Sequence, residues 1–387
     1  MDKKRFQTRA IHVGNMPDRE TGAVSPPIHL TSTYEQEKAG IHKGFDYSRG
    51  GNPTRNRLEQ NIASLEDGKY GIAFSSGMAA TTALFQTLNK GDHVIIGRNV
   101  YGGTYRMAVE VLSNHGFEFE FVDTRFIESI ETALKPNTKW IFLETPTNPL
   151  LELSDIKLIS DLCKTNNIYL AVDNTFMSPY GQRPLNLGAD IVMHSATKFI
   201  GGHSDLIAGA LITSNSELAE RLYFIQKSGG AIPSPFDCWI LLRSTKTMAL
   251  RVQKQSDNAM HLAKILQSHN TVDSVIYPGL ETHSQHNLAT IQQVNPQGDS
   301  IFGCMISIKC TTIEKRDRFL SKVQLFTLAE SLGGVESLVC LPYEMTHASV
   351  PTEMKEAMGL TPELLRLSVG VENIDDLVED ITTALDN

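Results

Sequence analysis

The sequence predicts an α/β protein in which helices cover both faces of a mainly parallel β-sheet. Two observations favour this fold class: short apolar runs alternate with helical patterns, and the run at 168–172 is too apolar for an edge strand. Ligands in such sheets bind beyond the carboxyl ends of the strands. We therefore expect functional residues directly after the runs at 71–74, 93–96, 117–122, 139–143, 168–172, 190–193 and 208–213.

The first fifty residues have a different character. They are rich in Gly, Pro, Thr and His, with weak periodicity, which predicts an extended arm over residues 1–52. Such an arm needs a surface to lie on. A helix is then predicted from Pro53, because proline suits a first helical turn and Leu58, Ile62 and Leu65 recur at helical spacing.

Helical patterns dominate residues 214–267, and a second α/β segment follows them. A chain of 387 residues suits two to three domains at about 150 residues each. We therefore expect a larger α/β domain over 53–247 and a smaller α/β domain over 248–387. The strands expected in the smaller domain are 274–277, 304–308 and 365–369.

Charge and cysteine content exclude several classes of partner. The net charge is −9 and no long basic run occurs, so the chain offers no electrostatic footprint for nucleic acid or an anionic membrane. A small molecule is then the default ligand. The five cysteines fit neither a zinc site nor a disulfide framework, which is typical of core thiols in a reducing compartment. No secretory leader pattern is present, and we expect a cytoplasmic protein.

The first candidate site follows the expected strand at 190–193. Ser195 and Thr197 precede Lys198 there, and two glycines come shortly after. This pattern suits an amine nucleophile beside an anion site, although a surface lysine before a glycine turn would look the same. The histidines of the segment have no third ligand at a suitable spacing, so we expect no metal.

Two further candidates also follow expected strands. Asp173 emerges at the carboxyl end of the run at 168–172, where a carboxylate needs a cationic or donor partner; a helix N-cap is the alternative. The turn containing Gly77 and Met78 opens a helix whose free backbone N–H groups attract an anion. Many α/β turns of this kind bind nothing.

Arginines supply the last candidates. Arg49 follows Tyr47 beside a Gly-Gly turn of the arm, and Arg366 lies on one face of the expected strand at 365–369. Arginine binds phosphate or carboxylate through two hydrogen bonds, but a solvated arm residue and a salt bridge are the alternatives. Together, an amine, a carboxylate, an anion site and a carboxylate-binding arginine are the parts that pyridoxal phosphate requires.

The order of motifs supports that cofactor. The chain carries YSRGGNPTR (47–55), YGGTYR (101–106), ETPTNP (144–149), VDNTF (172–176), SATK (195–198) and AESLGG (329–334). By these motifs it resembles the Cys/Met-metabolism family of pyridoxal phosphate enzymes, in the group of cystathionine γ-lyase and γ-synthase, over nearly its whole length. The resemblance implies fold type I and a homotetramer of two active dimers, which gives the arm a neighbouring subunit to lie on.

The resemblance also implies residue roles. Lys198 would bind the cofactor aldehyde covalently and act as a base, Asp173 would pair with the pyridine nitrogen, and Tyr101 would stack on the ring and exchange a proton with the departing sulfur. The phosphate would be held by Gly77, Met78, Ser195 and Thr197, helped by Tyr47 and Arg49 of a neighbouring subunit. The substrate carboxylate would be bound by Arg366, Ser331 and Asn148, and the far end of the substrate would meet Asp46, Arg106 and Glu330.

The reaction is harder to choose, because elimination and replacement share their early steps. Acidic Asp46 and Glu330 suit the distal ammonium of cystathionine. We therefore expect a γ-lyase that yields cysteine, 2-oxobutyrate and ammonia. Cystathionine γ-synthase and cystathionine β-lyase are the alternatives within the family. An inactive structural relative is the alternative from another class, and it is disfavoured because both Lys198 and Asp173 are present.

Overall fold

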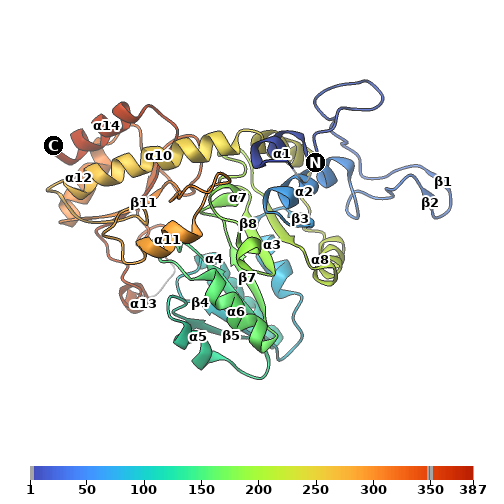
Figure 1. Cartoon of the computed structure of the whole chain (residues 1–387), viewed down its shortest axis with the longest axis horizontal. Coiled ribbons are helices and arrows are strands. Elements are labelled where there is room, and N and C mark those ends of the chain that lie inside the picture. Colours follow the sequence, from blue (N-terminus) through green and yellow to red (C-terminus); the bar gives the residue numbers. More distant parts are fainter. Residues whose placement is uncertain (1–3, 347, 349–351, 387) are drawn as a thin grey trace.

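The larger sheet of the computed structural model has seven strands in the order β3-β9-β8-β7-β6-β4-β5 (Figure 1). The structure describes residues 4–346, 348 and 352–386. Strands β8, β7, β6, β4 and β5 pair in parallel, and β9 runs antiparallel to both of its neighbours. The mainly parallel α/β sheet is therefore confirmed. Its strands are β3 (Tyr70–Phe74), β4 (His93–Gly97), β5 (Glu118–Val122), β6 (Thr138–Glu144), β7 (Tyr169–Asp173), β8 (Ile191–Ser195) and β9 (Gly209–Thr213).

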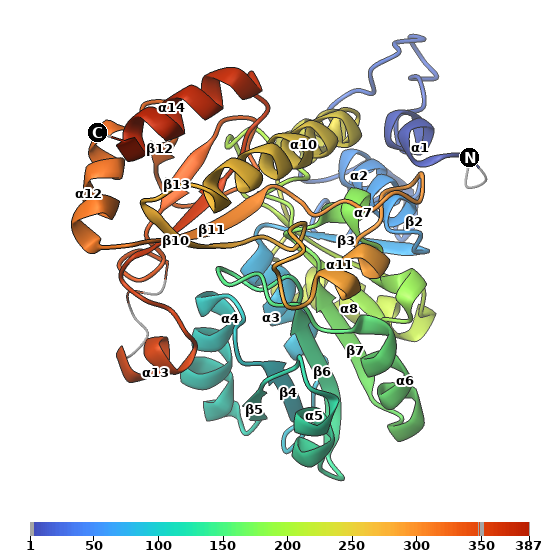
Figure 2. The ribbon, with the colours of Figure 1, turned by 60° about the vertical axis from the view of Figure 1, so that its left-hand side comes forward.

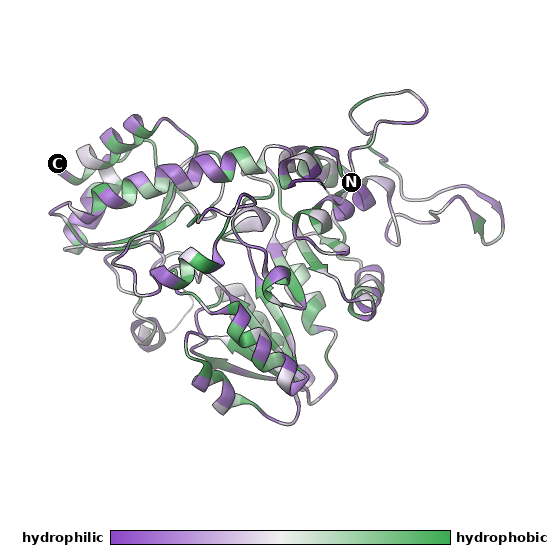
Figure 3. Cartoon of the chain, in the orientation of Figure 1, coloured by the Kyte–Doolittle hydropathy of each residue, from purple (hydrophilic) through white to green (hydrophobic). Residues whose placement is uncertain are grey.

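Every strand predicted for this sheet overlaps an observed one. The reason is burial on both faces, which leaves the central strands apolar throughout. Neighbouring residues Ile95 and Ile96 of β4, for example, are both fully buried but belong to separate core clusters on opposite faces. Figure 3 shows this pattern as hydrophobic strands between helices with hydrophilic outer sides.

Helices cover both faces of the sheet. One face packs against α3 (Gly77–Phe85), α8 (Ser216–Gly229) and the segment that continues from α4 (Gly102–Arg106). The opposite face packs against α5 (Ile127–Ala133) and α6 (Ile156–Asn166) near β4 and β6, and against α2 (Pro53–Leu65) and α9 (Pro235–Thr245) near β3 and β9. Among the described residues, no helix has the length and hydropathy needed to span a membrane.

A second sheet has five strands in the order β10-β11-β14-β13-β12, antiparallel except for the last pair. Helices α10 (Met248–Gln267), α12 (Ile313–Lys322) and α14 (Ile374–Asp386) lie along it (Figure 2). The domain boundaries at 52 and 247 stay predictions. The remaining elements are α7 (Ser178–Gly181), α11 (His286–Gln292), α13 (Thr352–Ala357), β10 (Val272–Ile276), β11 (Met305–Cys310), β12 (Thr327–Leu328), β13 (Leu338–Cys340) and β14 (Leu364–Ser368).

The N-terminal arm differs from expectation in one segment. Residues Phe6–His12 form helix α1 rather than extended chain, because Phe6 and Ala10 lie one helical turn apart and are both buried in the core beside α2. Beyond α1, residues 13–52 of the arm form turns, bends and a short hairpin. Its hairpin, β1 (Gln36–Lys38) and β2 (Ile41–His42), is fully exposed and projects away from the body (Figure 1).

All five cysteines are unpaired and buried. Burial raises the pKa of the Cys163 and Cys304 thiols to about 12 and that of Cys310 to about 11, and it also raises those of Cys238 and Cys340. These thiols therefore stay protonated at physiological pH.

Asn52 connects the arm to the first helix of the large sheet. Its Oδ1 accepts hydrogen bonds from Thr54 N at 2.9 Å and Arg55 N at 3.3 Å, which caps α2, and its Nδ2 donates to His29 O at 3.0 Å. Because the side chain is almost completely buried, we expect Asn52→Ala to lower the free energy of unfolding by about 1–2 kcal/mol, measured by urea unfolding followed by circular dichroism.

Asn166→Ala is the control, because Asn166 is exposed and bonds only to a carbonyl within its own helix. Equal unfolding curves for the two variants would contradict the capping role.

Candidate active site

A cavity of about 530 Å³ lies where the carboxyl ends of the large-sheet strands face residues of the second sheet. All the predicted site residues line it except those of the arm. They come from the large sheet and its loops (Gly77, Met78, Tyr101, Arg106, Asn148, Asp173, Ser195, Thr197 and Lys198) and from the second sheet and its loops (Glu330, Ser331 and Arg366).

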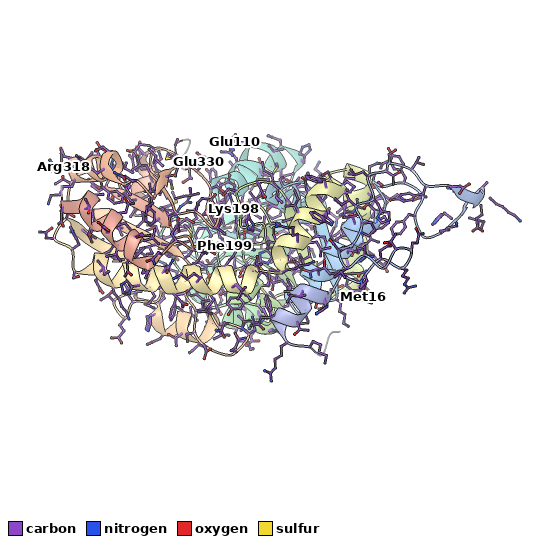
Figure 4. The ribbon with its side chains drawn as sticks, turned by 90° about the horizontal axis from the view of Figure 1, so that it is seen from above. Met16, Glu110, Lys198, Phe199, Arg318 and Glu330 are labelled. Atoms are coloured by element: carbon purple, nitrogen blue, oxygen red, sulfur yellow. The ribbon has the colours of Figure 1, made fainter. Side chains whose placement is uncertain are left out.

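Lys198 lies in the turn that follows β8, well inside the molecule (Figure 4). Its Nζ donates a hydrogen bond to Ser331 Oγ at 2.8 Å. Burial, and then the positive charge of Arg366, lower the pKa of Lys198 to about 8, and Glu330 offsets only part of this lowering. A substantial fraction of the amine is therefore neutral near physiological pH, the form that a nucleophile or base requires.

Arg366 is fixed from two sides. It alternates along β14 with Leu365 and Leu367, which are buried in the core. Its Nη1 donates to Asn148 Oδ1 and its Nη2 to Ser331 O, each at 2.8 Å. Ser331 accepts this bond from a left-handed backbone conformation, φ +81°, a strained geometry typical of functional sites. Arg366 Nε is buried and has no partner among the described residues, which leaves a donor for an anionic ligand.

Asp173 ends β7, as the sequence predicts, and is buried. Thr175 N donates to its Oδ1 at 2.9 Å. Burial raises the pKa of Asp173, and the hydrogen bonds from Thr175 offset this only in part. No ion pair to Asp173 is present among the described residues. A protonated ring nitrogen would supply the missing donor, so the carboxyl group fits the pyridine ring of pyridoxal phosphate.

An anion site lies at the start of α3. The Ser76 side chain caps Ala79 N at 3.0 Å, and Gly77 and Met78 line the cavity where the helix begins. A Cβ on Gly77 would lie 2.9 Å from Ser195 Cβ, so only glycine lets the helix start approach the Ser195 hydroxyl this closely. Thr197 Oγ1, which accepts a hydrogen bond from Ala208 N at 3.0 Å, adds a second hydroxyl. This cradle fits a phosphate group.

Tyr101 and Glu330 flank the open parts of the cavity. A Cβ on Gly103 would lie 2.5 Å from Tyr101 Cε1, so the tyrosine ring lies directly over that glycine. Glu330 and Arg106 are exposed, and Glu330 lies closer to the edge of the molecule than Lys198 does (Figure 4). The cavity thus combines a buried end, with Lys198 and Arg366, and an exposed end of mixed charge.

Sequence reasoning missed Glu144 and Thr175. Glu144 ends β6, lies opposite Asp173 in the parallel ladder and lines the cavity. Burial, and then the neighbouring Asp173, raise the pKa of Glu144 well above its usual value. The rule that selected Asp173, a polar residue directly after a buried run, would have found Glu144 after the run at 139–143.

The arm residues lie elsewhere. Tyr47 and Arg49 line a separate surface cavity, where Arg49 Nη1 donates to Lys227 O at 2.7 Å, and Asp46 is exposed. The structure therefore does not bring these three residues to the active site of their own chain. His194 bonds to buried Glu66, and the described residues contain no cluster of His, Cys, Asp or Glu that could hold a metal ion.

Known proteins share this architecture. A cystathionine gamma-lyase of Bacillus subtilis is 50% identical over 381 residues, which cover 98% of this chain and 99% of that protein. A cystathionine beta-lyase of Lactococcus lactis subsp. cremoris is 48% identical over the same length, with 98% and 99% covered. The crystal structure of a cystathionine gamma synthase from Xanthomonas oryzae pv. oryzae superposes with a TM-score of 0.95 at 37% identity, covering 99% of this chain and 98% of that one.

The family comparison agrees with the chemistry of the cavity. The model of the family described as Cys/Met metabolism PLP-dependent enzyme matches residues 7–386. A partly neutral lysine, a buried carboxyl group and an anion cradle in one cavity are the groups that its cofactor needs. The chain belongs to the Cys/Met-metabolism family of pyridoxal phosphate-dependent enzymes.

Proposed function

We propose that the protein is a cystathionine γ-lyase that converts L-cystathionine and water to cysteine, 2-oxobutyrate and ammonia. The observation that carries this proposal is the pairing of a fixed arginine, Arg366, with an exposed acid, Glu330, in one cavity. Cystathionine carries a carboxylate next to its reacting carbon and an ammonium at its far end. A cavity with a cation at its buried end and an acid at its exposed end suits that charge pattern.

The substrate carboxylate binds at Arg366, whose guanidinium is held by Asn148 and Ser331. Because these partners fix the guanidinium before substrate arrives, little side-chain entropy is lost on binding. Glu330 then binds the distal ammonium. The two ends of the substrate are held separately, which places the carbon–sulfur bond between them.

Proton transfer falls to Lys198 and Tyr101. Bound pyridoxal phosphate supplies an electron sink that stabilises negative charge on the substrate's α carbon. Lys198 Nζ, neutral in part at pH 7–8, takes the proton from the α carbon and then moves a proton at the β carbon. Asp173 holds the proton of the ring nitrogen, and the Tyr101 hydroxyl donates a proton to the departing sulfur.

We also propose that the enzyme is a homotetramer of two active dimers, in which Tyr47, Arg49 and Asp46 complete the site of a neighbouring subunit. Two observations support this assembly. The hairpin of the arm projects from the body (Figure 1), and apolar Val24 and Leu30 of the arm are 81% and 70% exposed. Apolar side chains on an extended segment gain free energy when a partner surface covers them.

One observation favours a second candidate, cystathionine γ-synthase. Arg106 lines the cavity and is exposed, so it provides a cation for the succinyl carboxylate of an activated homoserine. Both reactions need Lys198, Tyr101 and Arg366. The difference lies in whether the intermediate is released as an oxo acid or captured by an incoming thiol.

The products decide the reaction. We expect cystathionine alone to yield cysteine, 2-oxobutyrate and ammonia, identified by chromatography and mass spectrometry. O-succinylhomoserine with cysteine should give little cystathionine. Pyruvate and homocysteine from the first incubation would indicate a β-lyase, and efficient synthesis in the second with little cleavage in the first would indicate a γ-synthase.

As a test of the distal site, Glu330→Ala should weaken cystathionine cleavage about tenfold, and should affect substrates without a distal amine much less.

The lowered pKa of Lys198 predicts a pH dependence. In the folded protein without cofactor, we expect the rate of Lys198 acetylation by acetic anhydride to rise with pH and to reach half its maximum near pH 8, measured by peptide mass spectrometry. In urea the same lysine should reach half its maximum only at about pH 10.4, the ordinary lysine value. Because folding disfavours the charged amine, this group makes the folded state more stable as pH rises between the two values. Equal profiles in the folded and unfolded chains would contradict the assignment.

Subunit mixing tests the assembly. Arg49→Ala should weaken cofactor retention, and Lys198→Ala should lower turnover by at least about 100-fold. After exchange of equal amounts of the two variants, mixed dimers contain one site with both residues intact, so about a quarter of the wild-type sites should be active. A mixture of Arg49→Ala with the double variant Arg49→Ala/Lys198→Ala is the control and should regain nothing. Strictly additive activity, with exchange verified by mass spectrometry, would mean that each chain builds its own site.

A further inference from the structure

We infer that Glu144 is a positioning residue, whose single carboxyl group fixes both Tyr101, the ring-stacking residue, and Asn148, which orients the substrate-binding arginine. Glu144 Oε2 accepts a hydrogen bond from Tyr101 N at 2.6 Å, and Oε1 accepts one from Asn148 N at 3.1 Å. The inference rests on the proposed roles of Tyr101 and Asn148. The inference adds that one carboxyl group holds both of these residues in place.

The first contact matters because it ties Tyr101 to the sheet, whereas the bonds that its carbonyl accepts from Thr104 N and Tyr105 N only join it to the start of α4. Tyr101 precedes α4, whose first two residues are Gly102 and Gly103, and its own ring is 43% exposed. Glycines leave the backbone with wide conformational freedom, so the direction of the ring depends on how the peptide at Tyr101 is held. A short hydrogen bond from that peptide to a buried strand end ties the ring to the rigid sheet.

The second contact reaches the substrate side of the cavity. Asn148 N bonds to Glu144, while Asn148 Oδ1 accepts from Arg366 Nη1 at 2.8 Å. Glu144, Asn148 and Arg366 therefore form a continuous chain of hydrogen bonds from the large sheet to β14 of the second sheet. A change at Glu144 should reach the guanidinium without removing any group that contacts the substrate.

The location of Glu144 makes it a suitable anchor. It ends β6 in the middle of the larger sheet and is 6% exposed. Hydrogen bonds between a carboxyl group and backbone N–H groups are stronger when water is excluded. Because glutamine has only one accepting oxygen at this position, Glu144→Gln keeps the shape of the side chain and removes one of the two anchors.

The control is a second buried glutamate outside the cavity. Glu59 is 7% exposed, and its Oε1 accepts from Ala73 N at 3.0 Å and from a glutamine amide. Glu59→Gln therefore makes the same substitution at a buried glutamate but leaves one oxygen to accept both bonds. Thermal unfolding of both variants then measures the purely structural cost. Glu144→Asp is a second variant, which retains both oxygens on a shorter side chain.

The readouts report the cofactor and the carboxylate site separately. We expect Glu144→Gln holoenzyme to show altered visible circular dichroism of the bound cofactor, weaker binding of glycine by about tenfold, and a KM rise that exceeds the change in kcat. Glu144→Asp should recover part of each effect. Glu59→Gln should leave all three unchanged even where it lowers the unfolding temperature.

Wild-type dichroism and glycine binding in Glu144→Gln would overturn the inference, as would effects in both glutamine variants that scale with lost thermal stability. If Glu144→Gln does not fold, unchanged dichroism and glycine binding in Glu144→Asp would overturn it, and altered values would support it. Dichroism and glycine binding require no turnover. A failure of the proposed γ-lyase reaction therefore leaves this test intact.

Discussion

The cavity brings the carboxyl groups of Glu144 and Asp173 together with Lys198 and Arg366, and the distances between these groups depend on the relative position of the two sheets. Glu144 and Asp173 end neighbouring strands of the larger sheet, Lys198 follows the next strand, and Arg366 comes from the second sheet. Charged groups removed from water are costly unless opposite charges or hydrogen bonds compensate them. These groups therefore meet only when both sheets are folded and docked.

Buried amides help to hold that docking. Gln292 of α11 bonds to Ser154 O and to Gln182 Oε1, and Gln182 in turn bonds to Asn174 next to Asp173. Such contacts are directional, unlike apolar packing, so they restrict sliding of one unit over the other. Polar contacts distant from the cofactor residues therefore help to fix the shape of the cavity.

The sequence was informative where a single segment determines the outcome. Apolar runs located the strands of the larger sheet, and the rule that ligands lie beyond strand ends located Asp173 and Lys198. The sequence was uninformative where an element is stabilised by contacts with residues far away in the chain. Helix α1 depends on burial of Phe6 against distant Tyr180, and β12 and β13 are too short to show a period. The strand-end rule covers Glu144 as well, but its two backbone partners, Tyr101 N and Asn148 N, are visible only in the folded chain. The roles of Tyr47, Arg49 and Asp46 depend on a second subunit and stay predictions.

The burial of all five cysteines has a consequence for the chemical durability of the enzyme. Thiol–disulfide exchange requires an accessible thiolate, and both burial and a raised pKa suppress it. Under the proposed reaction every turnover releases a thiol, and oxidation of that product would place a reactive disulfide next to the protein. An enzyme with an exposed, acidic cysteine would accumulate mixed disulfides with its own product. This chain presents no such target among its described residues, so under the proposed reaction its own thiols are protected from a disulfide formed from the product.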